Sequence, residues 1–135
     1  MALELSNLES FDPGEIEKLG ICGIVTSDDV LRQAASRQSR KQLAMQAGVA
    51  EGSLLRLART IDLMRISGIG EAHAQLLGAL EIGCVEDLGH QEAAMLIKAM
   101  RRKNVELTLV RSVPPESNLA RWIVDAKTLP IVLEI

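Results

Sequence analysis

The sequence predicts a compact all-α fold, a tandem helix-hairpin-helix repeat with short helices and an extended C-terminal tail. Three observations predict it. Apolar anchors at Leu63 and Ile66 precede a Gly68-Ile69-Gly70 turn, after which a helical pattern resumes. A diverged copy of this pattern lies upstream. Short segments of helical apolar spacing, each with cap residues, fill most of the remaining chain.

The internal repeat has two offsets. Ser10-Phe11-Asp12 aligns with Gly68-Ile69-Gly70 at an offset of 58 in the numbering, whereas Arg56 aligns with Arg121 at an offset of 65. The second copy therefore has about seven extra residues around 104–115. We expect a single domain over residues 1–135, because each supersecondary unit of a repeat needs its neighbour to bury a core. Repeat unit one covers about 4–62 and repeat unit two about 66–128.

The helices of the first copy are expected at about 2–9, 14–20, 38–47 and 51–65, with a further helical segment at Asp28-Asp29-Val30-Leu31. Pro13 suits a helix start, Thr26 or Ser27 can cap the next helix, and Gly48 suits a helix end. The helices of the second copy are expected at about 71–80, 85–89, 91–103 and 116–128. In the Gly-Ile-Gly turn we expect Ile69 to be buried and Gly68 or Gly70 to hold a positive φ, so that Gly70→Val lowers stability.

One segment is ambiguous. Residues 105–110 alternate apolar and polar side chains as a strand does, but Asn104 can equally cap a short helix there. We favour the helix because its copy is helical throughout. Pro114-Pro115 interrupts the chain, and Pro130–Ile135 is expected to be an extended tail packed across the body.

Composition excludes several classes of protein. The chain has 47% hydrophobic residues but no apolar run that could span a bilayer and no signal peptide, so we expect a cytoplasmic protein without membrane contact. Cys22 and Cys84 have no CxxC spacing and are expected to be buried free thiols without zinc. Phe11 and Trp122 are the only aromatic residues. Stacking on single-stranded nucleic acid is therefore not expected, and Trp122 is interpreted as a core anchor.

Four motifs together carry a family resemblance. They are Gly68-Ile69-Gly70 with Ala74, the acidic segments after each hairpin, Leu63-Met64-Arg65, and the ending from Trp122 to Pro130. The chain resembles the bacterial family described as domain of unknown function 4332 over essentially its whole length. The resemblance implies a tandem helix-hairpin-helix fold and no assigned biochemical role. Phe11-Asp12-Pro13 departs from the expected Gly-hydrophobic-Gly turn, so the resemblance implies no phosphate binding by the first hairpin.

Candidate nucleic-acid contacts come from the turn and from two basic helix faces. The backbone N–H groups of Gly68, Ile69 and Gly70 open a helix and can bind a phosphate, although Glu71 competes for the same amides. Net charge is −3, yet residues 32–59 have a local net charge of +5 and residues 95–111 of +4. Two basic trios have the spacing i, i+3, i+4, which places each trio on one helix face: Arg37, Arg40 and Lys41 in the first copy, and Lys98, Arg101 and Arg102 in the second. Each face is either a phosphate contact or a solvated surface. Besides the turn, the candidates are Arg65, His73, Arg37, Arg40, Lys41, Lys98, Arg101 and Arg102.

No motif points to catalysis, a metal or a cofactor. The acidic pairs Asp28-Asp29 and Glu86-Asp87 lie in helix first turns, where capping explains them, and His90 has no ligand partner at metal spacing. We therefore expect a non-catalytic helix-hairpin-helix module that binds duplex DNA weakly and without base specificity. The alternative is a protein–protein interaction or scaffolding domain whose hairpins serve only for packing. The sequence leaves open the partner and the oligomeric state.

Overall fold

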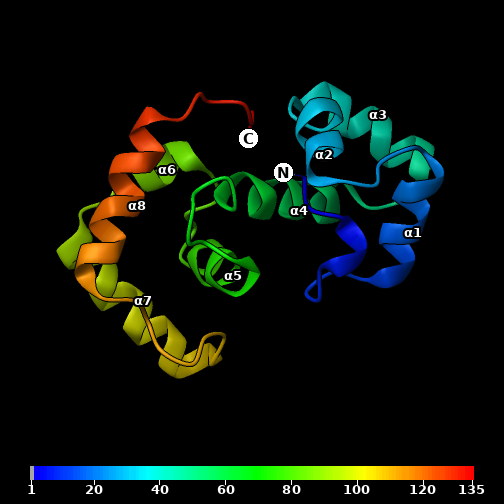
Figure 1. The fold of residues 1–135 in the computed structure, drawn as a ribbon. Coiled ribbons are helices and arrows are strands. Elements are labelled where there is room, and N and C mark those ends of the chain that lie inside the picture. The colour runs from blue at the N-terminus through cyan, green and yellow to red at the C-terminus, as the bar shows by residue number, and fades with distance from the viewer. Residues whose placement is uncertain (1) are drawn as a thin grey trace. The chain divides into compact units, whose positions relative to one another are not determined.

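The computed structural model describes residues 2–135, and its chain is all-α, with no strand among these residues. Contacts within the described chain divide it into two compact units. Unit 1 comprises residues up to Ile61 together with Val132–Ile135, and unit 2 comprises Asp62–Ile131. The predicted fold class is thereby confirmed at the level of a compact helical fold (Figure 1).

Unit 1 contains a 3-10 turn, η1, and the first four helices. They are η1 (Leu5–Asn7), α1 (Pro13–Ile21), α2 (Ser27–Gln33), α3 (Arg37–Ala47) and α4 (Glu51–Leu63), whose last two residues belong to unit 2. The predicted first helix over 2–9 is wrong, because only η1 forms there, and α4 ends at Leu63 rather than at 65. Within the unit, α3 packs against α1 and α2. Phe11, Leu19, Ile24, Val30, Leu43, Leu54 and Leu57 are among the buried side chains of this core.

Local capping explains where the helices of unit 1 begin and end. Asp12 caps α1, with its carboxylate accepting from the Glu15 backbone N–H at 3.3 Å, and Pro13 occupies the first helical position. Thr26 and Asp29 form a reciprocal capping box at α2, which decides between the two cap candidates in favour of Thr26. At the end of α3, Gly48 has φ +73°, the left-handed conformation that favours glycine.

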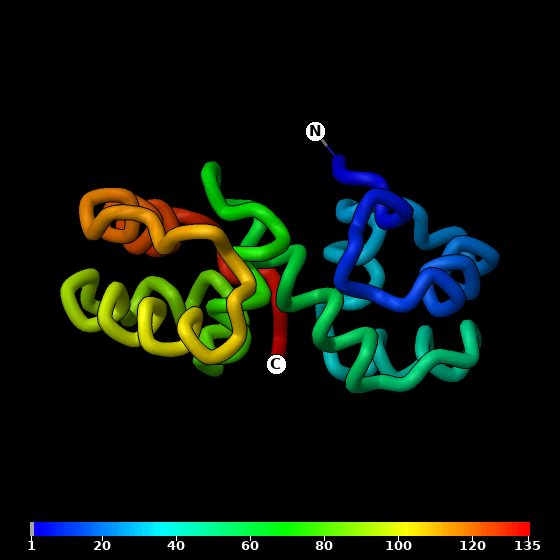
Figure 2. The backbone as a smooth tube through the Cα atoms, turned by 90° about the horizontal axis from the view of Figure 1, so that it is seen from below, coloured from blue at the N-terminus to red at the C-terminus, as the bar shows by residue number. Residues whose placement is uncertain are grey.

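Unit 2 contains the last four helices. They are α5 (Glu71–Ala79), α6 (Val85–Gly89), α7 (Ala93–Leu107) and α8 (Glu116–Thr128). Helix α8 packs against both α6 and α7, and Figure 2 shows α7 and α8 side by side. Their contacts bury one apolar core that includes Ile69, Leu77, Ile82, Leu96, Met100, Leu119 and Trp122. Trp122 is therefore a core residue, as predicted.

The ambiguous segment after Asn104 is neither a strand nor a separate helix. Helix α7 continues to Leu107, and Thr108 then adopts φ +51°. The Asn104 side chain holds the following loop, because its Oδ1 accepts from the N–H groups of Leu109 and Val110 and its Nδ2 donates to the Val110 carbonyl. The predicted cap residue thus stabilises the end of a long helix rather than the start of a short one.

Helix boundaries recur at the two sequence offsets. The first and last residues of α5 lie at the offset of 58 from those of α1, and the first and last residues of α8 lie at the offset of 65 from those of α4. Asp29 and Asp87, related by the first offset, have the same role before α2 and α6, since each carboxylate accepts from a backbone N–H four residues earlier. The extra residues of the second copy lie at the end of α7 and in the loop before α8.

The two cysteines differ in burial, and the tail after α8 lacks helices. Cys84 is buried as predicted, whereas Cys22 is only half-buried. The tail from Pro130 onward has no regular structure, as predicted, and its last residues pack within unit 1.

Candidate functional site

The Gly68–Gly70 turn leads directly into the N-terminus of α5. Gly68 has φ +96°, so it is the residue of positive φ, whereas Gly70 has φ −92°, and a Cβ on Gly70 would meet no atom within 4 Å. The predicted backbone strain of Gly70→Val is therefore wrong, and strain is expected instead for substitutions of Gly68. Gly70 caps α5 without a side-chain acceptor, so the cap residue leaves the N–H groups of the first turn to other acceptors. Ile69 is buried, and its own N–H donates to the Ile66 carbonyl at 3.1 Å.

Two side chains of α8 lie against Gly68. A Cβ on this glycine would lie 3.1 Å from Trp122 Nε1 and 3.2 Å from Arg121 Nη2. Trp122 is 2% exposed, and its buried Nε1 has no hydrogen-bond partner among the described residues. The turn thus brings together an exposed guanidinium, an unpaired N–H donor and the N-terminus of α5. The guanidinium and the helix N-terminus attract an anion.

His73 lies next to this cluster but does not add a positive charge. Its ring meets the Trp122 ring edge-on, with centroids 5.6 Å apart. Burial lowers the pKa of His73, so the imidazole is neutral at pH 7. His73 is half-buried. It shapes the turn by packing.

Arg65 is engaged elsewhere. Its Nη1 forms an ion pair with Asp62 at 2.9 Å, and its Nη2 donates to the Pro130 carbonyl at 3.0 Å. The second oxygen of Asp62 accepts from the Val85 N–H at the start of α6. Arg65 therefore holds the end of α4 to the segment after α8, and the structure does not present it to a ligand of the turn.

The two basic trios differ in exposure. Lys98, Arg101 and Arg102 are all exposed on α7, in the same unit as the turn. On α3, Arg40 is 4% exposed, and its Nη1 donates to the Ala34 and Ala35 carbonyls at the end of α2. The expectation of one basic face on α3 is wrong, because a helix C-terminus attracts this guanidinium inward.

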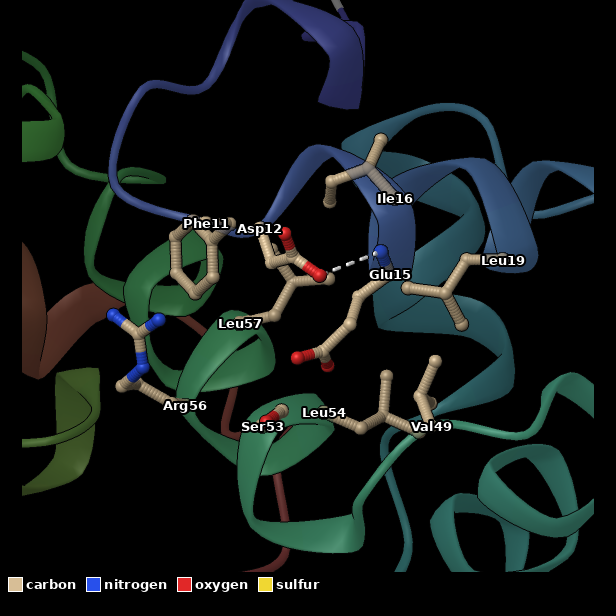
Figure 3. A pocket seen from close by; sticks show the side chains of 10 residues that line it. All are labelled: Phe11, Asp12, Glu15, Ile16, Leu19, Val49, Ser53, Leu54, Arg56 and Leu57. Carbon is tan, nitrogen blue, oxygen red and sulfur yellow. Dashed lines mark hydrogen bonds between the residues drawn. The ribbon is translucent and has the colours of Figure 1, made fainter.

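Unit 1 has a counterpart of the turn in which a carboxylate of the protein caps the helix that follows. Arg56 occupies the place of Arg121, and its Nη2 donates to the Ser10 carbonyl at 3.1 Å. Its guanidinium also stacks over the Phe11 ring at 4.2 Å. Here, however, the Asp12 carboxylate caps the helix, beside a pocket of only about 20 Å³ (Figure 3). An external anion would meet a carboxylate at this turn.

Sequence reasoning missed Arg121. The second repeat offset paired it with Arg56, but nothing in the sequence indicated that both arginines reach a turn far away along the chain. Within residues 2–135, no group of three His, Cys, Asp or Glu side chains could hold a metal ion. No helix in that range has the length and apolarity needed to cross a membrane.

Comparison with known proteins identifies the family. The family described as "Domain of unknown function (DUF4332)" matches residues 9–129, so the chain belongs to it. No curated protein and no solved structure matches the chain.

Proposed function

We propose that this member of the DUF4332 family is a non-catalytic, cytoplasmic module that binds the phosphate backbone of duplex DNA. Unit 2 makes the contact, with the segment around Gly68–Gly70 acting as a helix-hairpin-helix. Binding is weak and independent of base sequence, because phosphate contacts carry no sequence information. No cofactor takes part.

One observation carries the proposal: Arg121 lies against Gly68, two residues before Gly70, and Gly70 caps α5 without a side-chain acceptor. Backbone N–H groups and a guanidinium are donors that suit a phosphate. The exposed trio on α7, Lys98, Arg101 and Arg102, supplies further positive charge in the same unit. Glu71 opposes binding, since it places a carboxylate at the first position of α5.

The test is a fluorescence anisotropy titration of a labelled duplex at low salt. In Gly70→Asp a carboxylate takes the place that Asp12 has in unit 1, which should weaken binding about tenfold or more. This variant should fold as well as the parent, because Gly70 has an ordinary φ and Asp is a better N-cap than Gly by about a few tenths of a kcal/mol. Loss of affinity then cannot be ascribed to unfolding.

Matched variants distinguish binding at the turn from attraction of the duplex by the protein's overall charge. Arg121→Ala should weaken binding about tenfold, whereas Arg56→Ala removes the same charge from unit 1 and should leave affinity within about twofold. Glu71→Lys should strengthen binding. Replacing Arg101 and Arg102 by Ala should reduce the slope of log K against log salt by up to about 1.8, at about 0.9 per phosphate contact.

Two outcomes would contradict the proposal. One is no binding by the parent at about 100 micromolar, the weak end of non-specific affinity, with no gain from Glu71→Lys. The other is an equal loss in Arg56→Ala and Arg121→Ala, which would mean that net charge alone drives association. The first result would favour the alternative, a protein-interaction domain, and the second would rule out the turn as the site of duplex binding.

A further inference from the structure

The end of the chain is bound at the start of α3 in unit 1. Leu133 is 5% exposed, and the Glu134 N–H donates to the Ala35 carbonyl at 2.8 Å. The Glu134 carboxylate accepts from the Arg37 backbone N–H at 2.8 Å, and Arg37 Nε donates to the Ile135 carbonyl at 2.6 Å. The last three residues of the chain therefore make both backbone and side-chain contacts, as a bound peptide does.

The charges around Glu134 favour a carboxylate at this position. The N–H of Arg37 belongs to the first residue of α3, where the helix dipole attracts negative charge. Arg40 is buried nearby, and burial lowers the pKa of its guanidinium while the Glu134 charge opposes that shift. The carboxylate thus compensates a buried cation whose hydrogen bonds go to the carbonyls at the end of α2.

The same surface extends beyond the tail. A groove of about 570 Å³ lies between α3 and α4, and Ile135 is among the residues that line it. Arg37 and Lys41 line it from α3, and Glu51 and Leu55 line it from α4. It therefore has room for several more side chains and offers basic side chains of α3 opposite Glu51 and the apolar Leu55 of α4.

We propose that this surface is a binding site for an extended peptide with a glutamate between two aliphatic residues, filled in cis by Leu133-Glu134-Ile135. A partner protein carrying such a segment displaces the tail and continues into the groove. All contacting residues belong to unit 1, so the proposal is independent of duplex binding by unit 2.

The test uses the full chain and a labelled peptide of residues 129–135, Leu-Pro-Ile-Val-Leu-Glu-Ile, acetylated and amidated so that its ends carry no charge. In Glu134→Lys the tail meets Arg37 with a like charge and leaves the site. The peptide should bind this variant at least about tenfold more tightly than the parent, since a tethered tail competes at roughly millimolar effective concentration. The same peptide with Gln for Glu should bind more weakly.

Two variants made on the Glu134→Lys background locate the contact. Arg37→Ala keeps the backbone N–H and loses only the guanidinium. Arg37→Pro also removes the N–H, yet proline suits the first helical position, and Ser36 with φ −97° and ψ 157° is compatible with a following proline. Peptide affinity should fall in both, and further in Arg37→Pro.

Circular dichroism and thermal unfolding establish that each variant is folded. The proposal is overturned if the peptide binds folded Glu134→Lys no better than it binds the parent, or if Gln replaces Glu in the peptide without loss. It is also overturned if Glu134→Lys gains affinity for a labelled duplex instead, because the surface would then be a nucleic-acid contact.

Discussion

Replacing Gly68 by Ala tests the construction of the turn. At φ +96° an L-residue is strained by about 1–2 kcal/mol. The new Cβ would also lie 3.1 Å from Trp122 Nε1, tighter than van der Waals contact, and the ring is held within the core of unit 2. Arg121 can swing away, but Trp122 cannot. We therefore expect Gly68→Ala to lower the free energy of unfolding by about 2–3 kcal/mol.

The matched control is Gly70→Ala. Its φ of −92° suits any residue, and a Cβ there meets nothing within 4 Å. Alanine reduces the entropy of the unfolded chain but is a poorer N-cap than glycine, so the two effects offset to within about 0.5 kcal/mol. Urea unfolding followed by circular dichroism and by Trp122 fluorescence measures both variants. Equal stability of Gly68→Ala and Gly70→Ala would refute the assignment of strain to Gly68.

Three further predictions concern ionisable groups. Asp62→Ala should cost about 3 kcal/mol in the same assay, since it leaves a buried N–H and a guanidinium without their acceptor. Backbone N–H groups of Val25 and Thr26 lower the pKa of Asp29 to about 2, so its contribution to stability is complete above about pH 4 and is lost as the pH falls toward 2. NMR titration of Asp29, and acid unfolding of Asp29→Asn without that loss, check this. Burial lowers the pKa of His73 below 6.5, so stability should fall as the pH drops below about 6.5, and His73→Gln should abolish that dependence.

Features set by neighbouring residues could be predicted from the sequence. Helix α8 spans Glu116–Thr128, as predicted, because its start follows two prolines and its pattern aligns with α4. Capping acts within three or four residues, so Pro13 begins α1 and Thr26 caps α2, both within the predicted choices. Because the two copies align at fixed offsets, helix boundaries expected in one copy could also be expected in the other.

Features set by distant partners could not be predicted. Spacing placed Arg40 with Arg37 and Lys41 but gave no sign that the end of α2 would accept its guanidinium. Arg65 was assigned to the turn because of its position in the sequence, whereas the carbonyl of Pro130, far along the chain, accepts its hydrogen bond. Long cationic side chains reach several ångströms, so sequence distance says little about which acceptor they find.

The Gly-Ile-Gly turn shows that even within a single motif the sequence does not predict the role of each residue. Two glycines flank Ile69 symmetrically in the sequence, yet only Gly68 needs the freedom of glycine for its φ. Gly70 differs in another way, because a side chain there would face the first amides of α5, as Asp12 faces those of α1. Its lack of a side chain leaves the helix without a side-chain cap at little cost in stability, since glycine is itself an acceptable N-cap.

The two units therefore differ by one carboxylate at matching positions. Arg56 and Arg121 reach the same place in each copy, so the arginine alone does not decide whether a turn attracts an anion. Asp12 supplies negative charge within the protein, and its carboxylate accepts from the Glu15 N–H in the first turn of α1. Gly70 supplies none, so on the proposed function the matching donors in unit 2 take their acceptor from the phosphate backbone. On the proposed function, the turn of unit 1 carries its own carboxylate and the turn of unit 2 takes a phosphate, so duplex binding depends on unit 2 and its α7 trio, and so few phosphate contacts make that binding weak.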